Sequence, residues 1–259
     1  MRIARFSRDG AVSFGVVEGP GTDPADLVVA PIEGHPFAPF TFTGDRHPLS
    51  AVRLLSPVLP SKVVCIGKNY AEHAAEMGGP APEAPVVFLK PSTSVIGPGD
   101  PILLPRNSER VDYEAELGIV IGRLCREVPR ERAADVVLGY TCGNDVTARD
   151  HQKADGQWTR GKGHDSFCPL GPWVETDLSP GDLRVQCLVD GSVKQDGSTK
   201  DLIHDVPAVI EWVTAFMTLL PGDVILTGTP AGVGPLVAGN AVTVVVDGIG
   251  PLTNPVAAR

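Results

Sequence analysis

Residues 111–122 have the sequence VDYEAELGIVIG, and the prediction of the fold starts from this stretch. Its second half is a run of leucine, isoleucine and valine bounded by glycine, which is typical of a short buried strand rather than a helix. Side chains alternate along a strand, so Asp112, Glu114 and Glu116 are predicted to share one face. The residues that follow each of them are predicted on the opposite face.

The carboxylates of this strand point to a metal site. Two anionic side chains that enter a buried strand are unfavourable unless a cation compensates them. The Cα atoms of Glu114 and Glu116 are expected about 7 Å apart, which lets their side chains converge on one ion. Oxygen ligands alone favour a hard divalent metal such as Mg²⁺, Mn²⁺ or Ca²⁺. A polar strand end with solvated carboxylates explains the Glu-x-Glu pattern equally well.

Composition favours a turn-rich, mostly β architecture. The chain has 259 residues, enough for one large domain or for a large and a small one, with 29 glycines, 25 prolines and few aromatic residues. A net charge of −9 argues against nucleic acid and anionic membranes as partners. No stretch approaches the roughly 18 apolar residues of a membrane span, and no export signal is visible. Five widely spaced cysteines without a Cys-x-x-Cys motif predict reduced thiols in a cytoplasmic protein.

The pattern along the chain predicts two domains, a small module over residues 1–57 and a catalytic domain over residues 58–259. Two strands around Asp9-Gly10 form a predicted hairpin in the module. Three Pro-Gly-Asp turns are each followed by a predicted strand in the larger domain. Helices are expected over 129–138 and 205–220, the second with an apolar stripe that belongs to the core. The last strand is expected at 242–247.

A short helix over residues 70–77, with Asn69 as its cap, carries a candidate general base. His73 and Glu76 are three residues apart and therefore lie on the same face of this helix. A histidine oriented by a carboxylate is suited to activating water. An ordinary surface pair is the simpler interpretation of these two residues alone. The helix is followed by Gly-Gly-Pro-Ala-Pro, so the segment could move as a lid.

Further candidates lie between the middle and the end of the chain. Asp145 follows a β-prone segment and is a natural third oxygen ligand, although an Asx turn explains it equally well. Residues 152–165 are expected to form a polar loop that brings Arg160 and Lys162 to the acidic site, an arrangement that suits a carboxylate substrate. The Gly-rich stretch 228–234 lacks the Gly-Lys-Ser/Thr end of a P-loop, which argues against nucleotide binding.

Six segments in register resemble the fumarylacetoacetate hydrolase family, in its single-catalytic-domain branch. They span residues from about 60 to 250 and include Gly67-Lys68-Asn69-Tyr70 with His73 and Glu76, Phe88-Leu89-Lys90-Pro91, Tyr113-Glu114-Ala115-Glu116-Leu117, Gly143-Asn144-Asp145-Val146-Thr147-Ala148-Arg149-Asp150, Trp158-Thr159-Arg160-Gly161-Lys162 and Leu226-Thr227-Gly228-Thr229-Pro230-Ala231-Gly232-Val233-Gly234. Each segment is weak evidence alone, whereas six in the family's order are specific. Lys68 departs from members that have arginine or an apolar residue at this position, which puts substrate choice in doubt.

The resemblance implies a mixed β-sandwich/β-roll catalytic domain of the α+β type with a few short helices, assembled as a homodimer. It implies Mg²⁺ or Mn²⁺ as the cofactor, for which Ca²⁺ could substitute in a crystal. It assigns the metal to Glu114, Glu116 and Asp145, and catalysis to His73, Glu76 and Lys162. Substrate binding is transferred more loosely to Lys90, Gln152 and Thr229.

The resemblance also implies an enzyme that acts on a small 2-oxo acid. We expect hydrolysis of a C–C bond in a 3-acylpyruvate or a fumarylpyruvate-type diketo acid through a metal-held enolate. The same site could isomerise a 2-hydroxyhepta-2,4-diene-1,7-dioate or decarboxylate an oxaloacetate-type diacid. A metal-binding dimer without catalysis is the remaining alternative.

Overall fold

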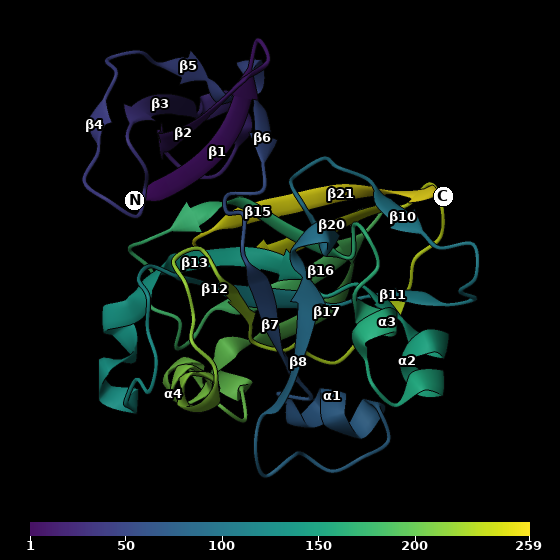
Figure 1. The fold of residues 1–259 in the computed structure, drawn as a ribbon. Helices are drawn as coiled ribbons and strands as arrows, with labels where there is room; N and C mark the ends of the chain where they lie inside the picture. The colour runs from purple at the N-terminus through teal and green to yellow at the C-terminus, as the bar shows by residue number, and fades with distance from the viewer.

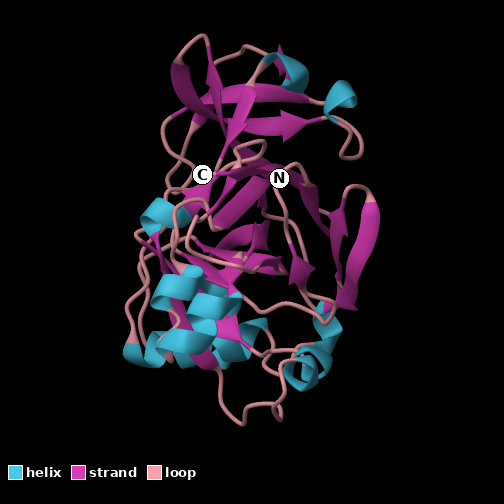
Figure 2. Ribbon diagram, turned by 90° about the vertical axis from the view of Figure 1, so that its right-hand side faces the viewer, coloured by secondary structure: helices cyan, strands magenta, loops and turns pink.

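Three β-sheets form the framework of the computed structural model of residues 1–259, and the α-helices lie at the end opposite the leading strands (Figure 1, Figure 2). The large sheet has 13 strands, and the other two have five and three. The predicted mostly β fold is therefore confirmed.

The leading strands lie at the top of Figure 1 and continue into the large sheet. They are β1 (Arg2–Arg8), β2 (Ala11–Glu18), β3 (Val28–Glu33), β4 (Thr41–Phe42), β5 (His47–Pro48) and β6 (Arg53–Leu55), with 3₁₀ turns η1 (Pro24–Asp26) and η2 (Leu49–Ala51). The predicted hairpin is confirmed: β1 and β2 are joined by Asp9 and Gly10, both with positive φ, which is the backbone of a tight hairpin turn. Because Ile3 of β1 also pairs with Val174, the first strand joins the leading module to the rest of the sheet.

The rest of the large sheet places one strand at the centre of the molecule. Its strands are β7 (Lys62–Gly67), β8 (Val86–Pro91), β9 (Val95–Ile96), β12 (Ala115–Ile121), β13 (Val137–Asn144), β15 (Cys168–Glu175) and β18 (Val224–Leu226). Their main order is β15-β13-β12-β18-β7-β8. Strand β12, the apolar run from which the prediction started, is thus paired on both sides and fully buried.

Two smaller sheets complete the framework. The five-stranded sheet has the order β10 (Ile102–Leu104), β21 (Gly250–Ala258), β20 (Ala241–Val246), β16 (Arg184–Val189) and β17 (Ser192–Ser198). The three-stranded sheet consists of β14 (Thr147–Ala148), β11 (Val111–Tyr113) and β19 (Gly234–Pro235). The three Pro-Gly-Asp turns precede β10, β16 and β18 as predicted. Strand β21 was not predicted, because Pro251 and Pro255 interrupt its otherwise alternating pattern.

The helices are short, and several differ from the prediction. They are α1 (Ala71–Glu76), α2 (Arg149–Asp155), α3 (Thr159–Lys162) and α4 (Val206–Phe216), with 3₁₀ turns η3 (Ser92–Ser94), η4 (Arg130–Val136) and η5 (Thr199–Asp201). The Asp205 side chain caps α4 as expected, but this helix ends at Phe216, and Leu220 is 39% exposed rather than part of the core. Asn69 does not cap α1; its amide instead donates to the carbonyls of His204 and Thr227.

Residues 152–165, expected as a loop, contain part of α2 and all of α3. Residues 130–136 form a 3₁₀ helix where an α-helix was predicted. All five cysteines are buried and unpaired, as expected. No helix in the structure is long and apolar enough to cross a membrane.

The alternation of β12 separates the core into two clusters. Leu117, Ile119 and Ile121 belong to a cluster of 42 buried residues, whereas Val120 belongs to a second cluster of 10. Glu116 precedes Val120 by four positions and so projects from the face of the second cluster. The carboxylate therefore lies at the end of an apolar layer, and Glu116 is only 2% exposed.

Candidate active site and metal centre

The polypeptide leaves the central strand at Glu114, which separates β11 from β12. The Glu114 backbone N–H donates to the side-chain oxygen of Asn144 at 2.9 Å, and the Glu114 carbonyl accepts the N–H of Asp145 at 2.9 Å. β11 pairs in the three-stranded sheet, whereas β12 pairs in the large one. The prediction of one continuous strand is therefore wrong at Glu114. The predicted alternation nevertheless holds across the break, because Asp112, Glu114 and Glu116 line the same cavity, whereas Tyr113, Ala115 and Leu117 belong to the large apolar cluster.

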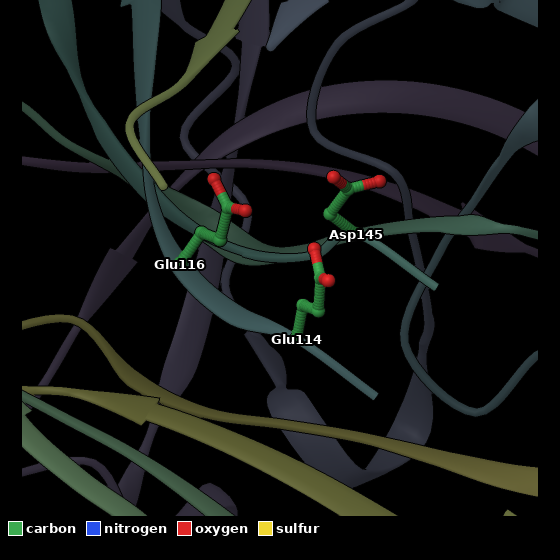
Figure 3. A group of neighbouring side chains, drawn as sticks. All are labelled: Glu114, Glu116 and Asp145. Atoms are coloured by element: carbon green, nitrogen blue, oxygen red, sulfur yellow. The ribbon is translucent and has the colours of Figure 1, made fainter. Parts of the chain in front are cut away.

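Three carboxylates meet beside this break. Glu114, Glu116 and Asp145 each offer one oxygen, and these atoms all lie within 4.8 Å of one another. Figure 3 shows the three side chains pointing toward a common space. Each residue is at most 3% exposed. The structure thus brings together all three predicted metal ligands.

Fixed cations hold two of these carboxylates. Glu114 accepts from Arg149 Nη2 at 2.6 Å and from Lys162 Nζ at 2.7 Å, one cation on each oxygen. Asp145 has the same arrangement, with Lys90 Nζ on Oδ1 and Lys162 Nζ on Oδ2, both at 2.5 Å. Burial opposes ionisation of Glu114, but Lys162 and Arg149 outweigh it and lower the pKa of this carboxyl. Lys162 therefore bridges the two carboxylates.

Glu116 lacks such a partner. Its only hydrogen bond is from the Gly228 N–H, 2.6 Å from Oε2. Burial, with the nearby charges of Asp145 and Glu114, raises the pKa of Glu116 well above its usual range. A buried carboxylate that faces two others and has no cation of its own is stabilised by a bound metal ion. Three oxygen donors suit Mg²⁺ or Mn²⁺, so the residues present fit the divalent metal that the sequence predicts.

The candidate general base lies on α1. His73 Nδ1 is 3.2 Å from Glu76 Oε2, and the imidazole is 5% exposed. The Gly232 N–H also donates to this carboxylate oxygen, at 3.2 Å. Since Nδ1 donates to Glu76, the free Nε2 is the nitrogen that can accept a proton.

A cavity of about 640 Å³ connects these groups. It is lined by Ile66, Gly67, Lys68, His73, Glu76, Met77, Gly78, Arg110, Asp112, Glu114, Glu116, Asp145, Arg149, Gln152, Lys153, Trp158, Lys162, Thr229 and Val233. The cavity thus contains every predicted site residue except Lys90, which is fully buried behind Asp145. Arg160, which was expected near the acidic site, is instead paired with Asp155 at 2.5 Å on the surface. That expectation is wrong because α3 holds Arg160 outside the cavity.

Arg149 is a site residue that sequence reasoning did not select. Its guanidinium donates to Asp112 at 2.9 Å, to Glu114 at 2.6 Å and to Gln152 at 3.0 Å. It therefore positions one predicted metal ligand and one predicted substrate-binding residue together. The signal in the sequence was Asp112, a carboxylate in a buried strand that requires a cationic partner.

Comparison with known families gives two matches. A model described as fumarylacetoacetate (FAA) hydrolase, C-terminal, matches residues 62–257. A second model, described as Rv2993c-like, N-terminal, matches residues 1–57.

Individual proteins are similar over the whole chain. Protein Rv2993c of Mycobacterium tuberculosis is 56% identical over 259 residues, which are 99% of this chain and 98% of that protein. A crystal structure named as 2-hydroxyhepta-2,4-diene-1,7-dioate isomerase from Mycobacterium marinum is 52% identical with a TM-score of 0.94, covering 100% of this chain and 99% of that one. A maleylpyruvate hydrolase from Sphingobium sp. SYK-6, in complex with manganese(II) and pyruvate, is 33% identical with a TM-score of 0.80 and the same coverage.

Proposed function

This chain belongs to the fumarylacetoacetate hydrolase family, and from that premise we propose that it is a divalent-metal-dependent hydrolase of small 2-oxo acids. The bond cleaved would be a C–C bond in a 3-acylpyruvate or a fumarylpyruvate-type diketo acid. One observation carries this proposal: the His73–Glu76 pair, Lys162 and the three carboxylates line a single cavity.

The metal would be held by Glu114, Glu116 and Asp145. A divalent ion in this position acts as a Lewis acid and stabilises the negative charge that develops on a 2-oxo acid when it becomes an enolate. Mg²⁺ and Mn²⁺ both fit an oxygen donor set, and the relative from Sphingobium contains manganese(II) together with pyruvate.

His73 would activate water. Glu76 fixes Nδ1 as the protonated nitrogen and stabilises the imidazolium, so Nε2 takes a proton from the water that attacks the distal carbonyl. Cleavage of the C–C bond then gives pyruvate, as its enolate, and a carboxylic acid. The enolate carbon takes up a proton to complete the reaction.

The remaining polar side chains would bind and orient the substrate. Lys162 carries the positive charge best placed to stabilise a developing oxyanion. Gln152 and Thr229 both line the cavity. The Gln152 oxygen accepts from Arg149, so its amide N–H groups are the ones that can bind the substrate. The Thr229 hydroxyl already donates to the Ala115 carbonyl and accepts from Gln195, so it can only accept one further hydrogen bond. Lys90 does not line it; we propose that Lys90 acts on the substrate only through Asp145, which it holds in place.

Isomerisation is the second candidate. The Mycobacterium marinum relative, 52% identical, is named as an isomerase, and moving a double bond requires the same stabilised enolate but no attacking water. Decarboxylation of a 2-oxo diacid also proceeds through this enolate. A metal-binding protein without catalysis is disfavoured because the base pair and Lys162 are placed together. We further expect a homodimer, which light scattering on the purified protein tests.

Product analysis separates these reactions. Mg²⁺-loaded protein is incubated with acetylpyruvate, fumarylpyruvate and oxaloacetate, and the products are identified by NMR. Pyruvate plus acetate or fumarate supports hydrolysis, and His73→Ala should reduce it about 100-fold or more while Mg²⁺ binding persists. Glu72→Ala, on the exposed face of the same helix, is the control. Pyruvate and CO₂ from oxaloacetate alone would identify a decarboxylase, and no product from any of the three would favour the isomerase.

A further inference from the structure

Two lysines in the cavity have no ionic partner. Lys68 and Lys153 both line it, and neither makes an ion pair or a side-chain hydrogen bond. Every other cation of the cavity is paired: Arg110 and Arg149 with Asp112, and Lys162 as described above. The cavity therefore carries two positive charges in excess of those that hold its own carboxylates.

The backbone at Lys68 is specialised. It has φ +56°, a left-handed conformation that side chains other than glycine adopt rarely and mostly where the surroundings impose it. On one side, a Cβ built on Gly79, just after α1, would lie 3.3 Å from Lys68 Nζ. The ammonium is thus located beside the turn that follows the His73–Glu76 helix.

The residue before Lys68 is packed against the segment between α2 and α3. A Cβ on Gly67 would lie 2.7 Å from Cζ3 of Trp158, so the indole packs directly on the backbone there. Trp158 also contacts Phe88 edge-on, with ring centroids 5.2 Å apart. This contact places the connection between α2 and α3 against β7. Lys153 reaches the cavity from α2, next to Gln152.

Charge makes these lysines unusual in this protein. The chain has a net charge of −9, which repels an anionic substrate at a distance. Lys162 lies on the carboxylates of the metal centre, so it can contact only the end of the substrate that binds there. Lys68 and Lys153 are the cavity cations that remain for that purpose.

We propose that Lys68, assisted by Lys153, binds a second carboxylate at the end of the substrate away from its 2-oxo acid. The substrate class is then a dicarboxylic 2-oxo acid, rather than an acylpyruvate with an apolar tail. This inference rests on the proposed function, because it takes the carboxylate cluster as the site that binds the 2-oxo acid.

Binding of two inert ligands tests the inference without turnover. 2-Oxoglutarate and 2-oxopentanoate have the same chain length, and neither has the second carbonyl that hydrolytic cleavage requires. Titration calorimetry with the Mg²⁺-loaded protein measures both dissociation constants. We expect the wild type to bind 2-oxoglutarate at least about 10-fold more tightly than 2-oxopentanoate, because one charge-assisted hydrogen bond contributes a free energy of this size.

Variants identify the residues responsible. Lys68→Met should remove most of this preference, Lys153→Met part of it, and Lys68→Arg should retain it. The matched control is Lys200→Met, which removes a lysine that is 60% exposed and lies 3.9 Å from Asp182, outside the cavity. Circular dichroism confirms that each variant is folded, and added salt should weaken the preference.

The outcomes distinguish this inference from the function on which it rests. Equal affinity of the wild type for both ligands overturns the inference and leaves the proposed function standing. The inference also fails if Lys68→Met retains the preference, or if Lys200→Met reduces it as much. Failure of both ligands to bind the metal-loaded protein contradicts the proposed function itself.

Discussion

Replacing Glu116 with glutamine should stabilise the metal-free protein and abolish its stabilisation by metal. Glu116 faces two other carboxylates within 4.8 Å and accepts one hydrogen bond, from Gly228. At an effective dielectric constant of about 20, two unit charges at this distance repel by roughly 3 kcal/mol. Lys162 and the other cations offset part of this repulsion, so the substitution is expected to raise the free energy of unfolding of the metal-free protein by about 1–2 kcal/mol. Glutamine keeps an oxygen for the Gly228 N–H and removes the charge.

The assay is thermal unfolding after dialysis against EDTA, with and without added Mg²⁺. For a chain of this size, about 1–2 kcal/mol raises Tm by roughly 2–8 °C in Glu116→Gln without metal. Mg²⁺ at about 100 times its dissociation constant should add about 2.7 kcal/mol to the wild type and little to the variant. Glu131→Gln, which removes an exposed charge on η4, controls for net charge. A lower Tm for metal-free Glu116→Gln, or equal stabilisation of both proteins by Mg²⁺, would refute the reasoning.

Three further predictions follow from other contacts. Asp223 accepts hydrogen bonds from Ser61, Lys62 and Leu220; burial opposes its ionisation, but the bond from Lys62 and the others lower its pKa. Asp223→Asn should therefore lower the free energy of unfolding, measured with urea at pH 7, by about 2–4 kcal/mol. The difference from wild type should shrink below about pH 4, where the carboxyl of the unfolded chain binds its proton. An equal difference at pH 7 and pH 3 would contradict this. Lys162→Met should reduce turnover about 100-fold or more without weakening Mg²⁺ binding, because Lys162 competes with a cation for two carboxylate oxygens; weaker Mg²⁺ binding in calorimetry would disprove that competition. Gly67→Ala should displace the Trp158 indole that packs on this glycine, shift the tryptophan fluorescence and lower the free energy of unfolding by about 1–3 kcal/mol. An unchanged emission spectrum would show that the indole does not pack there.

The carboxylate cluster could be predicted because strand periodicity is local information. Glu116 and the apolar residues after it alternate as a buried strand requires, and charged groups in such a strand need compensation. The His73–Glu76 pair follows equally from helical spacing. These residues carry their geometry within a few positions of sequence.

The rest of the site depends on contacts between distant segments. At the break, the Glu114 N–H donates to the Asn144 side chain, 30 positions away, and no local pattern signals this contact. Lys90 is the penultimate residue of an edge strand and resembles a surface lysine in sequence, yet it is fully buried beside Asp145 in the fold. Arg149 was overlooked for the same reason, since its three partners come from three different segments.

The arrangement of cations explains how this acidic cluster can be both stable and reactive. Arg149 and Lys90 each hold one oxygen of a carboxylate and are fixed by further contacts, to Asp112 and Gln152 and to the Val146 carbonyl respectively. Lys162 alone holds the second oxygen of both carboxylates, and its ammonium also lies 4.9 Å from the Phe88 ring. Lys162 therefore offsets the repulsion between carboxylates that would destabilise the fold. A divalent ion held by Glu114, Glu116 and Asp145 would compete with this ammonium for their oxygens. Because Lys162 lines the same cavity, an ammonium released by that competition would be available to contact the substrate.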